Sequence, residues 1–218
     1  MAWLMALDTT AQFGSLALLR DGELVEEVPL HSTEGFGDSI FGTIEGLLAR
    51  HHLTPHDVDC FAGATGPGSF TGVRVGLTVI KGLGEATGHP VVGVSNLQAM
   101  AAYGSAPLRA VILDARRAEV YGAVYDRELR CVQPELVSDF TNWLGGLPEG
   151  EIDFVALDFA PFASSLQGRA MVQAPKALAA SIASIAWREY AAGRALDPAA
   201  LDANYVRRSD AEMLWKEM

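Results

Sequence analysis

Two similar segments, one in each half of the 218-residue chain, constrain its fold most strongly. In the first half, residues 3–7 form an apolar run that ends at Asp8, and in the second half residues 109–113 form one that ends at Asp114. Each run is followed by two further apolar stretches joined by a turn, and the first of these turns, Asp21-Gly22, is a strong hairpin signal. The repetition predicts a duplicated βββ unit.

Helical periodicity follows each βββ segment, with fewer helical residues in the second half. We predict an α/β chain with two lobes, residues 1–105 and residues 106–218, the second reduced and ending in a tail from Pro198. The expected strands are residues 3–7, 14–20, 23–30, 58–64, 90–94, 109–114, 119–125, 130–137 and 154–157. The expected helices begin at Asp38 or Ser39 and at Ser69, and cover residues 95–103, 140–144 and 175–192.

The most distinctive turn, Gly66-Pro67-Gly68-Ser69, lies between an apolar strand and a helix. Glycine and proline predict a tight turn, and Ser69 is a suitable N-cap. The polar residues of the helix form a single narrow stripe, namely Arg74, Thr78, Lys81 and Glu85. A helix with one exposed side carries a wider polar face, so we expect this helix to be covered by its own sheet and by something else.

Composition and charge narrow the function classes. Half of the residues are hydrophobic, which is enough for a core, yet no apolar run reaches the roughly 20 residues that span a bilayer. Residues 1–7 lack a basic start, so we read a first strand and not a signal peptide. The net charge of -11 argues against binding of nucleic acid by the chain alone. Cys60 and Cys131 are expected to be reduced thiols in the cytoplasm.

The glycine-rich turn does not match the known nucleotide-binding motifs. A P-loop needs a lysine and then serine or threonine after its last glycine, whereas Ser69-Phe70 follows Gly68. Thr71 stands where the dinucleotide motif needs its third glycine. We favour a structural turn, and a turn that presents N–H groups to an anion stays as the alternative.

Asp8 and Asp114 suggest another kind of site, because carboxylates at these places organise metal and phosphate in two-lobed ATPases. However, Thr9-Thr10 replaces the glycine that such a phosphate turn supplies, and Arg116-Arg117 crowds the second turn. We therefore favour a role for each aspartate in capping its turn.

Three histidines, His51, His52 and His56, could suggest a metal cluster. Pro55 lies between them, so their spacing is not that of one continuous helix. At the end of a helix, His51 and His52 instead suit the helix dipole. We predict no metal, cofactor or catalytic site from these residues.

Several segments resemble the bacterial TsaB (YeaZ) family over nearly the whole chain. They are Leu7-Asp8-Thr9-Thr10, Gly66-Pro67-Gly68-Ser69-Phe70-Thr71-Gly72-Val73-Arg74-Val75-Gly76, Val92-Gly93-Val94-Ser95, residues 113–121 and Asn204-Tyr205-Val206-Arg207-Arg208. One departure is Phe36-Gly37, where TsaB-like chains often have His-Ser.

The resemblance implies an actin-like ATPase fold, the fold of acetate and sugar kinases and of chaperone ATPases. This fold has two βββαβα-type lobes, and the second is expected to be truncated here. The resemblance also implies a non-catalytic subunit that acts with the catalytic subunit TsaD and the ATPase TsaE to form threonylcarbamoyladenosine beside the anticodon of tRNA. The catalytic sister carries a His-x-x-x-His metal motif where this chain has Asn96 and Met100. Methionine is a poor ligand for a hard iron or zinc ion, so the metal is expected to be lost.

We expect a partner-binding surface on the two helices of the first lobe. The TsaD-like subunit would bind there, and a second copy of the chain would bind there when it is alone. A TsaE-like ATPase would join the complex, and tRNA would be contacted only through it, without a cofactor or a membrane. The expected interface residues are Phe41, Ile44, Glu45, Val75, Val79 and Leu83.

The alternative function is an enzyme, either a small ATPase or kinase of the same fold or a metallopeptidase. ATP hydrolysis or tightly bound metal in the purified chain would favour the enzyme. Co-purification with a TsaD-like subunit would favour the scaffold.

Overall fold

The computed structural model describes residues 1–117 and 119–207, which form two compact units. Unit 1 comprises Met1–Ala99 and Pro175–Ala203, and unit 2 comprises Met100–Ala174 and the segment that begins at Asn204. The first crossing lies near the predicted boundary at residue 105. The prediction did not anticipate that residues 175–203 return to unit 1, because it assigned them to the second lobe.

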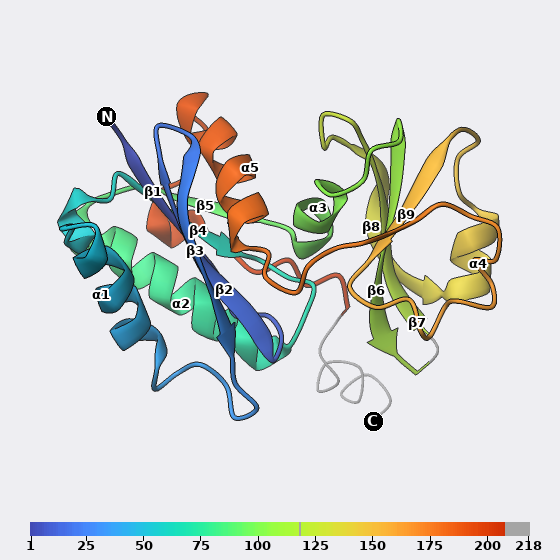
Figure 1. The fold of residues 1–218 in the computed structure, drawn as a ribbon, viewed down its shortest axis with the longest axis horizontal. Helices are drawn as coiled ribbons and strands as arrows, with labels where there is room; N and C mark the ends of the chain where they lie inside the picture. Colours follow the sequence, from blue (N-terminus) through green and yellow to red (C-terminus); the bar gives the residue numbers. More distant parts are fainter. Residues whose placement is uncertain (118, 208–218) are drawn as a thin grey trace. The chain divides into compact units, whose positions relative to one another are not determined.

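Unit 1 is built on a five-stranded sheet in the order β3-β2-β1-β4-β5 (Figure 1). The central strand β1 is antiparallel to β2 and parallel to β4. The two residues of the first hairpin turn, Asp21 and Gly22, both have positive φ, as its Asp-Gly sequence predicts. The strands are β1 (Trp3–Asp8), β2 (Phe13–Arg20), β3 (Glu23–His31), β4 (Cys60–Ala64) and β5 (Val91–Val94).

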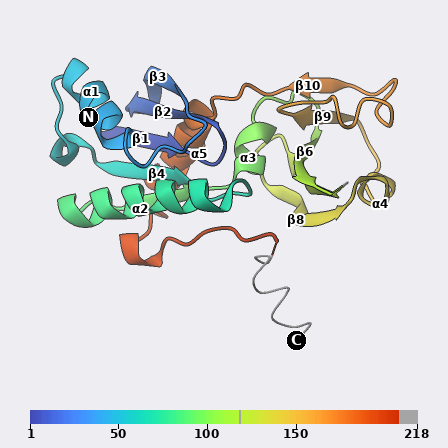
Figure 2. The same ribbon diagram turned by 90° about the horizontal axis from the view of Figure 1, so that it is seen from below.

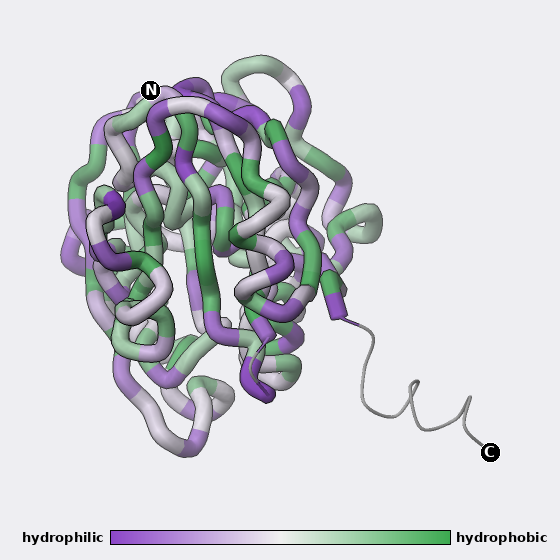
Figure 3. The backbone as a smooth tube through the Cα atoms, turned by 90° about the vertical axis from the view of Figure 1, so that its right-hand side faces the viewer, coloured by the Kyte–Doolittle hydropathy of each residue, from purple (hydrophilic) through white to green (hydrophobic). Residues whose placement is uncertain are grey.

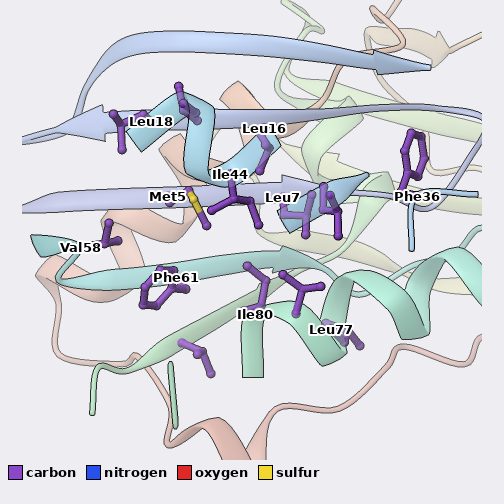
Figure 4. Close-up of a cluster of buried hydrophobic side chains, with 14 of the residues drawn as sticks. Met5, Leu7, Leu16, Leu18, Phe36, Ile44, Val58, Phe61, Leu77 and Ile80 are labelled. Atoms are coloured by element: carbon purple, nitrogen blue, oxygen red, sulfur yellow. The ribbon is translucent and has the colours of Figure 1, made fainter. Parts of the chain in front are cut away.

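Helices cover both faces of this sheet. On one face, α1 (Ile40–Arg50) and α2 (Phe70–Thr87) share a buried cluster with the sheet, to which Met5, Leu7 and Phe61 contribute (Figure 4). On the other, α5 (Ala179–Ala191) packs against β1, β2, β4 and β5. Because both faces are buried, β1 reads as a continuous apolar run. The short elements are η1 (Pro55–Asp57), α3 (Asn96–Ala101) and η2 (Pro198–Ala200).

Unit 2 repeats the connectivity of unit 1. Its sheet has the order β10-β9-β6-β7-β8, in which β6 is antiparallel to β7 and parallel to β9. The elements are β6 (Leu108–Arg116), β7 (Glu119–Asp126), β8 (Cys131–Asp139), α4 (Phe140–Gly145), β9 (Ile152–Ala156) and β10 (Met171–Gln173). No α-helix lies between β9 and β10 in the described part of the chain, where unit 1 has α2. The predicted duplication and the smaller second half are confirmed.

The last long helix begins later than predicted. We expected Pro175 as its first residue, but α5 begins at Ala179 after Leu178. The start is determined by the sheet, because Ser15 Oγ accepts the Ala179 N–H at 2.8 Å and Glu27 Oε1 accepts the Ala180 N–H at 2.9 Å. Two other differences are that α3 ends at Ala101 and that β10 was not predicted.

The helix α2 is covered on two sides, as its narrow polar stripe predicts. Figure 2 shows it between the sheet and the segment that carries η2, and Lys81 Nζ donates to the Leu201 carbonyl at 2.8 Å. Leu201 is buried in the core of unit 1, so this part of the tail does more than run along the surface. Arg208 and the rest of the predicted tail lie outside the described residues.

Hydrophobic segments alternate with hydrophilic ones along the backbone (Figure 3). The strands β1 and β4 are almost entirely buried. Among the helices of residues 1–117 and 119–207, none is long and apolar enough to cross a membrane.

Candidate functional site

Asp8, at the carboxyl end of β1, is the carboxylate that an ATPase-like cleft would use, and it is buried. Its side chain is 2% exposed. Asp8 Oδ1 accepts hydrogen bonds from the backbone N–H and the hydroxyl of Thr10, at 2.9 and 2.7 Å, and Asn96 Nδ2 lies 3.4 Å from Oδ2. Burial raises the pKa of Asp8, and the hydrogen bonds from Thr10 and Asn96 offset this only in part. The carboxylate is enclosed by its own chain.

The glycine-rich turn packs directly against the loop that follows Asp8. The Ser69 N–H donates to the Thr10 carbonyl at 2.7 Å. A Cβ added at Gly72 would lie 2.1 Å from the Thr9 carbonyl oxygen, and one added at Gly68 would lie 2.7 Å from Thr10 Cβ. These glycines are needed so that two segments of the chain can approach each other, which is the structural-turn interpretation favoured by the sequence.

The Thr9 hydroxyl closes the same region from the other side. It donates to the Gly72 carbonyl at 2.8 Å, and a Cβ at Gly76 would lie 2.5 Å from it. Thr9 and Thr10 therefore replace the open glycine turn of a phosphate-binding loop with side chains that bond within the protein.

Asn96, which stands where the metal motif would have its first histidine, is a structural residue here. It is 3% exposed, its Oδ1 accepts the Gly66 N–H at 3.0 Å, and its Nδ2 donates to the Thr10 hydroxyl at 2.8 Å. Met100, at the place of the second histidine, is fully buried. Within the described ranges, no three or more His, Cys, Asp or Glu residues gather as a metal would require.

Asp114, the counterpart of Asp8 in unit 2, is exposed and caps its turn. Its Oδ1 accepts the backbone N–H of Arg116 at 2.7 Å. Arg116 and Arg117 both have left-handed backbones, with φ of 63° and 58°. The two aspartates therefore have different environments, although the sequence places them at equivalent positions.

The candidate interface residues on α1 and α2 divide into two groups. Phe41 is 59% exposed, Glu45 is exposed, and Val75 and Leu83 are half-buried. Ile44 and Val79, by contrast, are 3% and 5% exposed and belong to the core of unit 1. Ile44 and Val79 are therefore core residues of unit 1, and a partner could contact directly only the exposed or half-buried members of the expected row. The interface itself stays a prediction.

Three glycines on these helices were not among the predicted interface residues. A Cβ added at Gly42 or Gly82 would meet nothing within 4 Å, and one at Gly46 would meet only the Arg50 side chain at 3.7 Å. A glycine inside a helix costs about 0.5–1 kcal/mol relative to alanine, and nothing within the chain requires one at these places. The four-residue spacing of Gly42 and Gly46 was the available signal, since it aligns them on one helix face.

Comparisons with known proteins identify the family of this chain. The family model of TsaD, tRNA N6-adenosine threonylcarbamoyltransferase, matches residues 28–195. The tRNA threonylcarbamoyladenosine biosynthesis protein TsaB of Escherichia coli is 35% identical over 158 residues, which cover 66% of this chain and 68% of that protein. The chain belongs to the TsaB (YeaZ) family. The Bacillus subtilis TsaB is 32% identical over 151 residues, covering 67% of this chain and 66% of that protein.

Solved structures extend the TsaB comparison to the fold. YeaZ from Pseudomonas aeruginosa aligns with a TM-score of 0.82 and 26% identity over 94% of this chain and 100% of that one. Component A of (R)-2-hydroxyglutaryl-CoA dehydratase from Acidaminococcus fermentans aligns with a TM-score of 0.54 and 10% identity over 88% and 100% of the two chains, which shows the fold alone. The predicted actin-like ATPase fold is confirmed.

Two further expectations concern residues outside the Asp8 region. Phe36, where the TsaB resemblance suggested histidine, is 4% exposed and fills the core of unit 1 (Figure 4). His51 lies with Nε2 2.7 Å from Glu26 Oε2, and hydrogen bonds from Arg50 and His51 lower the pKa of Glu26. His51 therefore belongs to a hydrogen-bond network with Glu26 and Arg50 near the surface of unit 1.

Proposed function

We propose that this chain is a non-catalytic scaffold and dimerisation subunit in the formation of threonylcarbamoyladenosine on tRNA. It binds a TsaD-like catalytic subunit through the exposed side of α1 and α2 and recruits a TsaE-like ATPase to the complex. When alone it pairs with a second copy, and it contacts tRNA only within the complex. A subunit with this function would be located in the cytoplasm, as we expect for this chain.

The enclosure of Asp8 is the observation that carries this proposal. In an actin-like ATPase, the aspartate at this place must reach a metal ion and phosphate, whereas Asp8 is 2% exposed and bonds to Thr10 and Asn96. Opening the site would require Thr9 and Thr10 to break their contacts with the glycine-rich turn. These contacts support the proposal that the fold serves a function other than ATP hydrolysis in this chain.

The surface of α1 and α2 supports protein binding as that purpose. Phe41 is a large apolar side chain that its own unit leaves 59% exposed. Gly42 and Gly82 leave open space above the helices, which allows another helix to approach closely. On α2, Gly82 follows Val75 by two helical turns and shares its face. A standard interface buries about 800 Å² on each partner, which two helices can supply.

The charge of the chain supports indirect recruitment of tRNA. With a net charge of -11, the chain lacks the excess of lysine and arginine that dominates affinity for nucleic acid. Filter binding of tRNA to the isolated chain is expected to be weak at physiological salt and to become strong only with the catalytic subunit present.

The decisive experiment uses Gly82→Leu on α2. Because leucine favours helices over glycine by roughly 0.5–1 kcal/mol and Gly82 has open space around it, the variant should be at least as stable as the parent chain. It should nevertheless lose self-association in sedimentation and co-purification with the TsaD-like subunit. Gly145→Leu, at the end of α4 in unit 2, also has open space and is the matched control. If Gly82→Leu still binds the catalytic subunit as the control does, the interface is elsewhere.

A further inference from the structure

Unit 2 contains a cavity that the proposed scaffold function does not use. Its volume is about 510 Å³, and all of its lining residues belong to unit 2. This volume lies in the range of small-molecule sites, which are about 300–1,000 Å³. The cavity is lined by residues from the end of β6, the start of β7 and the start of α4, and these residues differ in chemistry.

One side of the cavity is apolar. Phe140 and Phe162 are 9% and 5% exposed, and their ring centroids lie 4.9 Å apart. Pro161 lies beside them in the lining. Both rings belong to the buried core of unit 2, and only their remaining exposed edges, with Pro161, form the apolar part of the cavity lining.

The lining also carries a guanidinium group that is available to a ligand. Arg116 and Arg117 line the cavity from consecutive left-handed positions, and Asp114 Oδ1 fixes this turn by accepting the Arg116 N–H. The Arg116 guanidinium forms no hydrogen bond or ion pair with any other residue in the described part of the chain.

The acidic residues balance this positive charge. Glu119 is paired with Arg207, which also donates to the Ala115 carbonyl at 2.9 Å. Asp114 and Asp139 line the cavity as well, and each uses Oδ1 to accept backbone N–H groups. The lining therefore holds two arginines and three carboxylates, and Arg207, which is not part of the lining, pairs with one of the three. With that pair counted, the local charges balance, so the cavity favours neither a simple anion nor a simple cation.

We propose that this cavity binds a small zwitterion with an apolar body, such as a free amino acid or a short peptide. The Arg116 guanidinium receives the carboxylate, since its fork geometry matches two oxygens. The free oxygen of Asp114 or Asp139 receives the ammonium group, and the apolar body lies on Phe140 and Phe162.

Calorimetric titration of the full chain tests this proposal with three probes. L-Phenylalanine should bind saturably, whereas N-acetyl-L-phenylalanine, which lacks the ammonium group, and L-phenylalanine amide, which lacks the carboxylate, should each bind roughly tenfold more weakly or worse. Equal binding of phenylalanine and either derivative overturns the proposal, and so does the absence of saturable binding by all three probes.

A variant assigns the binding to this cavity. Arg116→Gln should weaken phenylalanine binding by roughly tenfold and leave binding of the amide unchanged, because only the carboxylate contacts Arg116. Arg127→Gln, an exposed arginine in the turn between β7 and β8, is the matched control and should change neither. If both variants weaken phenylalanine binding equally, or neither does, the site is not this cavity. None of these outcomes depends on binding of the TsaD-like subunit, so the two proposals fail separately.

Discussion

Asn96 Nδ2 lies 3.4 Å from Asp8 Oδ2, and this contact joins the start of α3 to the end of β1. The same side chain accepts the Gly66 N–H and donates to Thr10. The Asn96 carboxamide thus connects the start of α3, the glycine-rich turn and the loop after β1, which are the segments that would surround a catalytic cleft. Asn96 stands where the catalytic sister would have a metal ligand, and here its side chain stabilises the enclosure of Asp8.

Asn96→Ala should destabilise the chain by about 1–3 kcal/mol, because it leaves the buried Gly66 N–H without an acceptor. The measurement is the free energy of unfolding in urea. Asn142→Ala removes the same side chain from an exposed position on α4 and should change the free energy by less than about 0.5 kcal/mol. Equal effects of the two substitutions would show that the Asn96 bonds are not structural.

Asp8→Asn should make the stability of the chain less sensitive to rising pH. Burial raises the pKa of Asp8 in the folded state, so the protonated form stabilises folding at low pH and this contribution is lost as the pH rises through the folded pKa. The free energy of unfolding of the variant, relative to the parent, should therefore increase from about pH 4 upward. Urea unfolding across a pH series measures this difference, and a difference that stays flat or decreases contradicts the assignment.

Asp153→Asn should show the opposite pH dependence. Burial raises the pKa of Asp153, but hydrogen bonds from the N–H groups of Ala106 and Ser105 and from the Ser105 hydroxyl outweigh burial and lower it. The parent chain should be more stable than the variant by about 1–2 kcal/mol at neutral pH. This advantage should shrink below about pH 4, as the pH falls through the folded pKa. If the parent chain stays more stable than the variant in acid, the charged form of Asp153 is not the source of the difference in stability.

Ser15→Ala tests the unpredicted start of α5. Ser15 is fully buried and its Oγ is the acceptor of the Ala179 N–H, so the substitution leaves that donor unpaired and should cost about 1–3 kcal/mol. Thermal or urea unfolding measures the loss. Ser184→Ala, on the exposed side of the same helix, is the control and should be neutral or slightly stabilising because alanine favours helices.

The isolated chain should show no ATP hydrolysis that depends on Asp8. Since the carboxylate is enclosed and bonded to Thr10, Asp8→Ala should leave the phosphate release of the purified chain unchanged. A coupled phosphate assay checks this expectation. A clear drop in a measurable basal rate on substitution would favour the enzyme alternative over the scaffold.

The local pattern of the sequence predicted most elements of the fold. The hairpin at Asp21-Gly22, the N-cap Ser69 and the helix end before Gly193 each depend on the conformational preference of one or two residues. For Ser69 the expected hydrogen bond is present, since Oγ accepts the Gly72 N–H at 3.3 Å. Such features can be read locally because their energetics do not require distant partners.

The environments of chemically similar residues were decided only by the tertiary structure. Asp8 and Asp114 both follow an apolar run of the sequence, yet packing of the glycine-rich turn encloses the first while the second stays exposed near the end of β6. Val79 and Phe41 are both apolar helix residues, but the rotation of each helix on the sheet buries one and exposes the other. The sequence by itself determined which segments are strands, helices and turns. Burial, charge state and the return of α5 to unit 1 depend on contacts between distant residues, such as Ser15 with Ala179, and these exist only once the sheet has formed.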